Sequence, residues 1–204
     1  NLDEIDEFIT NDFDKYFIHR LKSIVKKVSD FLDEYEYALA SLTIEQFFWA
    51  EFCDNYLEIS KTRAYNEDAK DNHGQQSAII TLYYSLNYIL KIYSPFIPHI
   101  TEELYQLLYS DGGSIHIRGN WPNFEDDICE NQEISEAVLL LEILDLVRRA
   151  KADKNISIKA PIEVLKISGI AGLSPSNARD LMNVTSSENL MFVSDLDPAL
   201  SING

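Results

Sequence analysis

The stretch FFWAEFCDNYLEISK, residues 47 to 61, places five aromatic side chains and a cysteine in one segment. At α-helical spacing its apolar stripe is made of Phe48, Phe52, Tyr56 and Ile59. A polar edge along another side consists of Glu51, Asp54, Glu58 and Lys61. The stripe predicts a helix packed into a core, and we expect that core to take up Phe47, Phe48, Trp49 and Phe52. The polar edge then requires a separate explanation.

Helical periodicity continues on both sides of this stretch. Residues 14–35 carry apolar side chains on one face and predict a preceding helix. The sequence TIEQ at Thr43 has the pattern of a capping box, so the central helix is predicted to begin there and to end near Arg63. A polar loop is predicted at 66–76. Two more helices are predicted, one with an apolar ladder over 79–93 that stops at Pro95, and one that follows Pro98, is capped by Thr101 and ends near Tyr109.

The pattern changes after residue 109. The segment SDGGSIHIRGNWP, residues 110–122, contains a glycine turn, and Ile115 and Ile117 alternate with polar neighbours as in a short extended segment. An acidic stretch then leads into a long helix. Its inward residues are predicted to be Leu140, Ile143, Leu144 and Val147, while Arg148 and Lys151 are predicted to share an outer face.

A different period begins after Asn155. Residues 162–169 and 189–195 each predict a strand, and Ser174 followed by Pro175 predicts the capped start of a short helix between them. The fold class is therefore mainly α: an antiparallel helical bundle over residues 1–155, followed by a small strand–helix–strand α/β unit over 156–204.

Composition narrows the class of protein. The chain has 204 residues, of which 46% are hydrophobic, enough for a substantial core. Its two cysteines have no metal-ligand spacing, and no apolar run is long enough for a membrane span. The sequence lacks a glycine-rich phosphate loop and known catalytic motifs. We expect a cytosolic, monomeric chain with no catalytic residues, no metal and no cofactor of its own.

Charge is unevenly distributed along the chain. The formal net charge of −17 argues against a nonspecific nucleic-acid binder. Nevertheless, residues 15–27 contain five lysines and arginines and no acid, and residues 148–166 contain six against two acids. Such segments either present local positive stripes to phosphate or are ordinary solvated helix faces.

Several segments, in order, resemble the anticodon-binding region of class I aminoacyl-tRNA synthetases. They are DKYFIHRL (14–21), FFWAEFCDNYLEISK (47–61), YSPFIPHITEELYQLL (93–108), Trp121-Pro122 and LVRRAKADKNISIKAPIEV (146–164). Within that group the FCD segment is most similar to the valyl enzymes. Ala50, Asn55 and Tyr93 depart from residues that are common in the family.

The resemblance implies a role for the polar edge. Leu57 and Glu58 match the family's Leu-Glu pair at the anticodon, Leu57 as an apolar platform and Glu58 as a hydrogen-bond acceptor. Lys61 and Arg63 follow one turn later and are expected at the anticodon as well. Further candidates for contact with the tRNA backbone are Arg20, Lys22, Arg148, Arg149 and Lys151. An exposed Glu58–Lys61 ion pair is the simpler alternative for the edge.

The resemblance also implies partners outside this sequence. These are tRNA(Val) and the upstream catalytic and editing domains of the same chain, where ATP would be used. It also implies a further helix just before residue 1, without which a groove is left partly open. Two alternatives remain: an acidic helical module that binds a basic protein, and the equivalent domain of an isoleucyl-tRNA synthetase.

Overall fold

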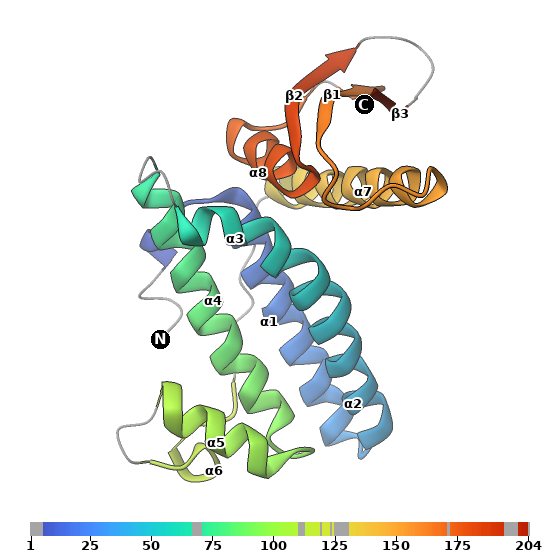
Figure 1. Ribbon diagram of the computed structural model, residues 1–204. Helices are drawn as coiled ribbons and strands as arrows, with labels where there is room; N and C mark the ends of the chain where they lie inside the picture. Colours follow the sequence, from blue (N-terminus) through green and yellow to red (C-terminus); the bar gives the residue numbers. More distant parts are fainter. Residues whose placement is uncertain are drawn as a thin grey trace.

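A helical bundle and a small α/β layer make up the computed structural model of the chain (Figure 1). The structure describes residues 6–66, 71–109, 113–118, 120–122, 124, 131–170, 172–193 and 200–203. In the bundle, the helical segments 12–33, 37–65 and 72–93 run side by side, and two short helices, at 98–108 and 115–118, lie across one end (Figure 1). At the other end the long helix 131–153 contacts the first of these segments. The helix 175–185 packs on that long helix and on residues 58–65. In the described residues no helix is long and apolar enough to span a bilayer.

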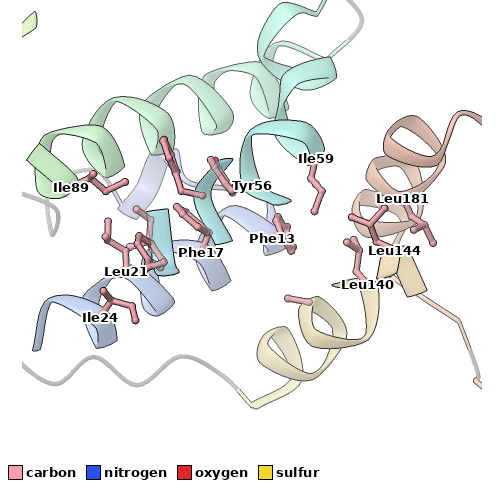
Figure 2. Close-up of a cluster of buried hydrophobic side chains, with 14 of the residues drawn as sticks. Phe13, Phe17, Leu21, Ile24, Tyr56, Ile59, Ile89, Leu140, Leu144 and Leu181 are labelled. Carbon is pink, nitrogen blue, oxygen red and sulfur yellow. The ribbon is translucent and has the colours of Figure 1, made fainter. Parts of the chain in front are cut away.

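Helix α1 (Asp12–Asp33) confirms the first predicted helix and follows a short 3₁₀ turn, η2 (Asp6–Phe8). The side chain of Asn11 caps it by accepting the backbone N–H groups of Phe13 and Asp14. Its apolar face carries the centre of the core, including Phe13, Phe17, Leu21 and Ile24 (Figure 2).

The second arm begins earlier than predicted. Helix α2 (Tyr37–Gln46) already contains Thr43, so the predicted capping box at Thr43 is wrong. Tyr35 takes a left-handed conformation, with φ of 62°, and ends α1. The N–H of Tyr35 donates to the carbonyl of Leu32 and that of Glu36 to the carbonyl of Phe31, the two bonds of a Schellman motif. The chain therefore turns at residue 35 and has room for six more helical residues before Thr43.

A π-helical segment, η3 (Phe47–Leu57), continues α2 and leads into α3 (Glu58–Tyr65). Its hydrogen bonds span i to i+5, and such geometry is rare over more than one turn. Phe47, Phe52 and Tyr56 are exposed by only 1%, 5% and 0%. The step of five residues from Phe47 to Phe52 fits i→i+5 bonding, and the slower rotation per residue holds all three rings on the core side.

Helix α4 (Asn72–Tyr93) ends before Pro95, as predicted, and α5 (Pro98–Leu108) has proline at its first position. The prediction that Thr101 caps α5 is wrong, because Ile97 is the N-cap and the hydroxyl of Thr101 donates to the carbonyls of Ile97 and Pro98. The predicted extended segment is also wrong. It is a short helix, α6 (Ile115–Arg118), whose residue Ile115 is buried.

The C-terminal unit has the predicted strand–helix–strand order. It consists of β1 (Ile162–Ser168), α8 (Pro175–Thr185) and β2 (Ser187–Val193), and Ser174 caps α8 through the N–H of Asn177. Strands β1 and β2 are parallel, with Ile162 opposite Ser187. A third strand that the sequence did not reveal, β3 (Leu200–Asn203), pairs antiparallel with β1, giving the order β2-β1-β3.

One continuous buried cluster joins the bundle to this unit. Leu140 and Leu144 of α7 (Asn131–Asp153) lie beside Leu181 of α8, next to Phe13 and Ile59 (Figure 2). The division into residues 1–155 and 156–204 stays a prediction.

Candidate functional site

Glu58 and Lys61 lie at the surface where η3 becomes α3. Lys61 Nζ donates to Glu58 Oε2 at 2.6 Å, and the two side chains are 47% and 48% exposed. An exposed pair of this kind contributes about 0–1 kcal/mol, because water solvates the separated ions nearly as well. The carboxylate is therefore open to solvent and can exchange its intramolecular partner for an external donor at little cost.

Leu57 precedes this pair and is half-buried against the core. Part of its side chain is fixed against the core, and part remains accessible, one residue before Glu58. An apolar side chain next to a charged acceptor matches what an unstacked nucleobase needs, namely a face to rest on and a partner for its polar edge.

Trp49 was expected in the core, and this is wrong, because its side chain is 58% exposed. The expectation is confirmed for Phe47 and Phe52, which are buried, while Phe48 is half-buried with its ring edge-on to Tyr93. In a regular α-helix of about 3.6 residues per turn, Trp49 and Glu58 would lie on opposite sides. The five-residue steps of η3 rotate them towards the same side, and Asp54 between them is exposed too.

We call this surface the η3 edge. It consists of Trp49, Asp54 and Leu57 of η3 and of the Glu58–Lys61 pair that follows. Sequence periodicity missed Trp49 because the predicted helical wheel assumed an α-helix throughout. Trp49 adds an exposed aromatic ring to this surface.

Arg63 was expected at the anticodon, and the structure contradicts this, because the residue is buried. It is only 5% exposed, and its guanidinium lies between two buried carboxylates. Nη1 and Nη2 donate to Asp14 at 2.8 Å each, and Nε donates to Asp180 Oδ1 at 2.9 Å. With its donors engaged inside the protein, Arg63 has a structural role.

Lys151 was expected on the outer face of its helix, which is also wrong. It is 1% exposed, and Nζ donates to the carbonyls of Ile158, Ala160 and Thr185 at 2.7, 2.7 and 2.9 Å. Burial lowers the pKa of this lysine. Its three donors hold the end of α7 to the following loop and to the end of α8.

Arg148 and Arg149, on the same helix, differ from each other. Arg148 is half-buried and donates to Asn55 Oδ1 at 2.7 Å and to the Asp54 carbonyl at 2.6 Å, so it fixes α7 to η3. Arg149 is exposed and pairs with Asp145 at 2.6 Å. A phosphate contact stays a prediction for both, and Arg149 has the more accessible guanidinium.

Arg20 and Lys22 come from the basic segment of α1. Arg20 forms a two-point ion pair with Glu51 of η3, at 2.7 and 2.8 Å, and is 39% exposed. Lys22 is half-buried, with its ammonium 5.7 Å from the centre of the Phe124 ring. Neither is adjacent in sequence to the η3 edge, although Glu51 connects Arg20 to η3.

Other reactive side chains do not form a site among the described residues. In those parts of the chain no three histidine, cysteine, aspartate or glutamate residues gather as they would around a metal ion. Cys53 is half-buried, and burial raises the pKa of its thiol, which makes it less reactive as a nucleophile.

Comparison with known proteins identifies the family of the chain. Residues 14–166 match the family described as the anticodon-binding domain of tRNA ligase. The chain is 55% identical over 189 residues to a valine–tRNA ligase of Rickettsia canadensis, and 53% identical over 191 residues to that of Rickettsia rickettsii. A third, from Rickettsia prowazekii, is 51% identical over 192 residues.

These alignments cover 93%, 93% and 94% of this chain but only 23% of each relative. The chain thus spans about a quarter of the length of the curated relatives it matches. The family match includes both the η3 edge and the bundle that supports it. The chain belongs to the family of anticodon-binding domains of tRNA ligases.

Proposed function

We propose that this chain reads the anticodon of a valine tRNA through its η3 edge. The observation that carries the proposal is the exposed carboxylate of Glu58, which follows the half-buried Leu57 where η3 meets α3 inside the family match. The relatives named above are valine–tRNA ligases, which supports valine over isoleucine as the amino acid.

The chemistry follows from the genetic code. Valine anticodons have adenine in the middle and cytosine in the third position, and both bases carry an exocyclic amino group that donates hydrogen bonds. An ionised carboxylate is an acceptor only, and its hydrogen bonds are among the stronger ones. Glu58 therefore accepts from a base amino group, while Leu57 supports the face of that base.

Two neighbours complete the edge. When a base amino group takes the place of Lys61 on the carboxylate, the ammonium of Lys61 is free to meet a phosphate. Trp49 offers an exposed ring on which a second unpaired base can stack, and such stacking contributes about 1–3 kcal/mol per base. The remaining candidates for phosphate lie outside this edge and are Arg20, Lys22, Arg148 and Arg149.

In the whole protein, this domain would position the tRNA so that its acceptor end reaches a catalytic domain elsewhere in the chain. ATP-dependent aminoacylation and editing would belong to that missing part. A monomer in the cytoplasm is the state we propose for the whole protein.

A binding experiment with two stem-loops tests the proposal. A valine anticodon stem-loop and one with uracil in place of the third-position cytosine are titrated with the wild-type chain and with Glu58→Gln. We expect Glu58→Gln to weaken the valine loop about tenfold, because a charge-assisted hydrogen bond is lost, and to reduce discrimination between the loops.

The matched control is Glu142→Gln, which removes an exposed carboxylate from α7. It should leave both affinities unchanged. Equal losses for the two loops in Glu58→Gln would reject base reading. Binding that is insensitive to salt would reject an RNA interface, since counterion release makes RNA binding salt-dependent.

A further inference from the structure

A second feature of the surface is a cavity of about 420 Å³ at the end of α4 that adjoins α5. Its volume lies within the range of ligand pockets, about 300–1,000 Å³. None of the residues that line this cavity belongs to the η3 edge. The family assignment and the proposed anticodon contacts leave it without a role.

Aromatic rings form the walls. The Tyr83 and Tyr109 rings are 4.6 Å apart, and the Tyr109 hydroxyl donates to the Tyr83 carbonyl at 2.7 Å. Trp121 is held by a hydrogen bond from its indole N–H to Ser29 Oγ at 2.8 Å. Tyr84, Tyr88 and Tyr105 also line the cavity. Rings held by hydrogen bonds are pre-positioned, so a flat ligand that stacks on them orders little further structure.

Lys91 supplies a positive charge at the same place. It is half-buried, its ammonium lies 5.1 Å from the centre of the Tyr88 ring, and burial lowers its pKa. Within the described parts of the chain, the ammonium forms no ion pair and no side-chain hydrogen bond. A desolvated lysine with no counter-ion among the described residues is conspicuous in a chain whose net charge is −17.

Two amides complete the lining. Asn87 on α4 and Asn120, one residue before Trp121, each carry a donor group and an acceptor oxygen. Stacking surfaces, amides and a cation that has no anionic partner in the part of the chain that the structure describes together match a ligand that has a flat ring, a polar ring edge and a negative charge.

We propose that this cavity binds a nucleotide, with its base on the tyrosine rings, its base edge at Asn87 and Asn120, and its phosphate at Lys91. The nucleotide is either a free mononucleotide or a nucleotide of bound tRNA outside the anticodon loop. The proposal goes beyond the anticodon reading and does not depend on it.

Fluorescence tests the free nucleotide. The chain contains two tryptophans, so Trp49→Phe leaves Trp121 at the cavity as the single reporter. Titration with AMP should change its emission, and adenosine and inorganic phosphate should each bind more weakly. Adding Lys91→Met should weaken AMP about tenfold or more while leaving adenosine unchanged, because only the charged contact is lost.

Matched variants separate charge from packing. Lys91→Arg should retain most of the AMP affinity, and Lys159→Met, which removes an exposed lysine elsewhere, should retain all of it. Thermal melts establish that each variant is folded. Equal AMP affinity with and without the Lys91 charge would overturn a free-nucleotide site.

The second source, a nucleotide of bound tRNA, is tested with chains that keep Trp49. Whole valine tRNA and its anticodon stem-loop are titrated with wild type and Lys91→Met. If the cavity holds a tRNA nucleotide, Lys91→Met weakens whole tRNA about tenfold but leaves the stem-loop unchanged. If Lys91→Met changes neither AMP binding nor whole-tRNA binding, the proposal is wrong. The anticodon proposal is judged separately, by Glu58→Gln on the stem-loop.

Discussion

Arg63 and Asp14 are joined by two hydrogen bonds of 2.8 Å inside the protein, 49 positions apart in sequence. Asp14 also accepts from the Tyr56 hydroxyl at 2.8 Å and the Ser77 hydroxyl at 2.7 Å, and it is fully buried. The other side of the guanidinium meets Asp180 of α8. One guanidinium thus links α1, α3 and the C-terminal unit. Glu58 of the η3 edge is the first residue of α3, the helix that also carries Arg63.

Removal of this guanidinium should strongly destabilise the folded protein. Arg63→Met leaves two buried carboxylates without their partner, and we expect a loss of about 3–5 kcal/mol in the free energy of unfolding. Arg149→Met, which breaks an exposed pair, should cost less than about 1 kcal/mol. Urea denaturation followed by circular dichroism measures both, and similar losses in the two variants would contradict a structural role for Arg63.

The network should also make stability depend on pH. Burial, assisted by the negative charge of Asp14 and opposed by Arg63, raises the pKa of Asp180 from 3.8 to about 7. Between these values the folded state holds a proton that the unfolded state has lost, so the free energy of unfolding falls as pH rises from about 4 to about 7. Above about 7 this contribution no longer changes.

Asp180→Asn tests this, because the amide is neutral at every pH. The stability of Asp180→Asn minus that of the wild type should increase from pH 5 to pH 7, with a slope of at most about 1.4 kcal/mol per pH unit, and then level off. Urea titrations at each pH supply the difference. A difference that stays constant from pH 5 to pH 8 would show that Asp180 is ionised throughout.

Parts of this fold could be predicted because their signals are local. Periodicity located α1 and the part of α4 from residue 79 onward, although α4 begins at Asn72, inside the predicted loop. Ser174-Pro175 marked the start of α8. The start of α2 was missed because Tyr35 adopts the left-handed turn that glycine usually signals. Strand β3 has only four residues, too few for an alternating pattern to stand out.

The site was harder to predict because burial of a charge depends on distant partners. Arg63 has the sequence context of a surface residue, and its partner Asp180 lies 117 positions away. Lys151 likewise finds its carbonyl partners in a loop and at the end of α8. Trp49 was misplaced for another reason, since nothing in residue periodicity distinguishes i→i+5 from i→i+4 bonding before the structure is seen.

Lys151 provides a further stability prediction. Lys151→Met keeps the stem of the side chain but leaves three carbonyls without their donor. The hydrogen bond to Thr185 is the buried one, and a buried unsatisfied group costs about 1–3 kcal/mol. We expect a loss of at least about 2 kcal/mol in the free energy of unfolding, measured by urea denaturation. Lys159→Met, at an exposed position, is the control and should lie within about 0.5 kcal/mol of wild type. Equal stability of the two variants would refute the role of Lys151 as a link between α7 and α8.

Trp49 distinguishes stacking from base reading at the η3 edge. Because its ring is 58% exposed, Trp49→Ala should change the free energy of unfolding little, by less than about 1 kcal/mol. Loss of a stacking surface should weaken the valine stem-loop and the loop with the altered third base by the same factor, about tenfold, since every base has a flat face. Glu58→Gln should instead affect mainly the valine stem-loop.

The control is Trp49→Phe, which should retain most of the affinity, because a smaller ring still stacks. If Trp49→Ala binds both loops like wild type, the tryptophan takes no part in the interface, and the RNA contact is confined to Leu57, Glu58 and Lys61.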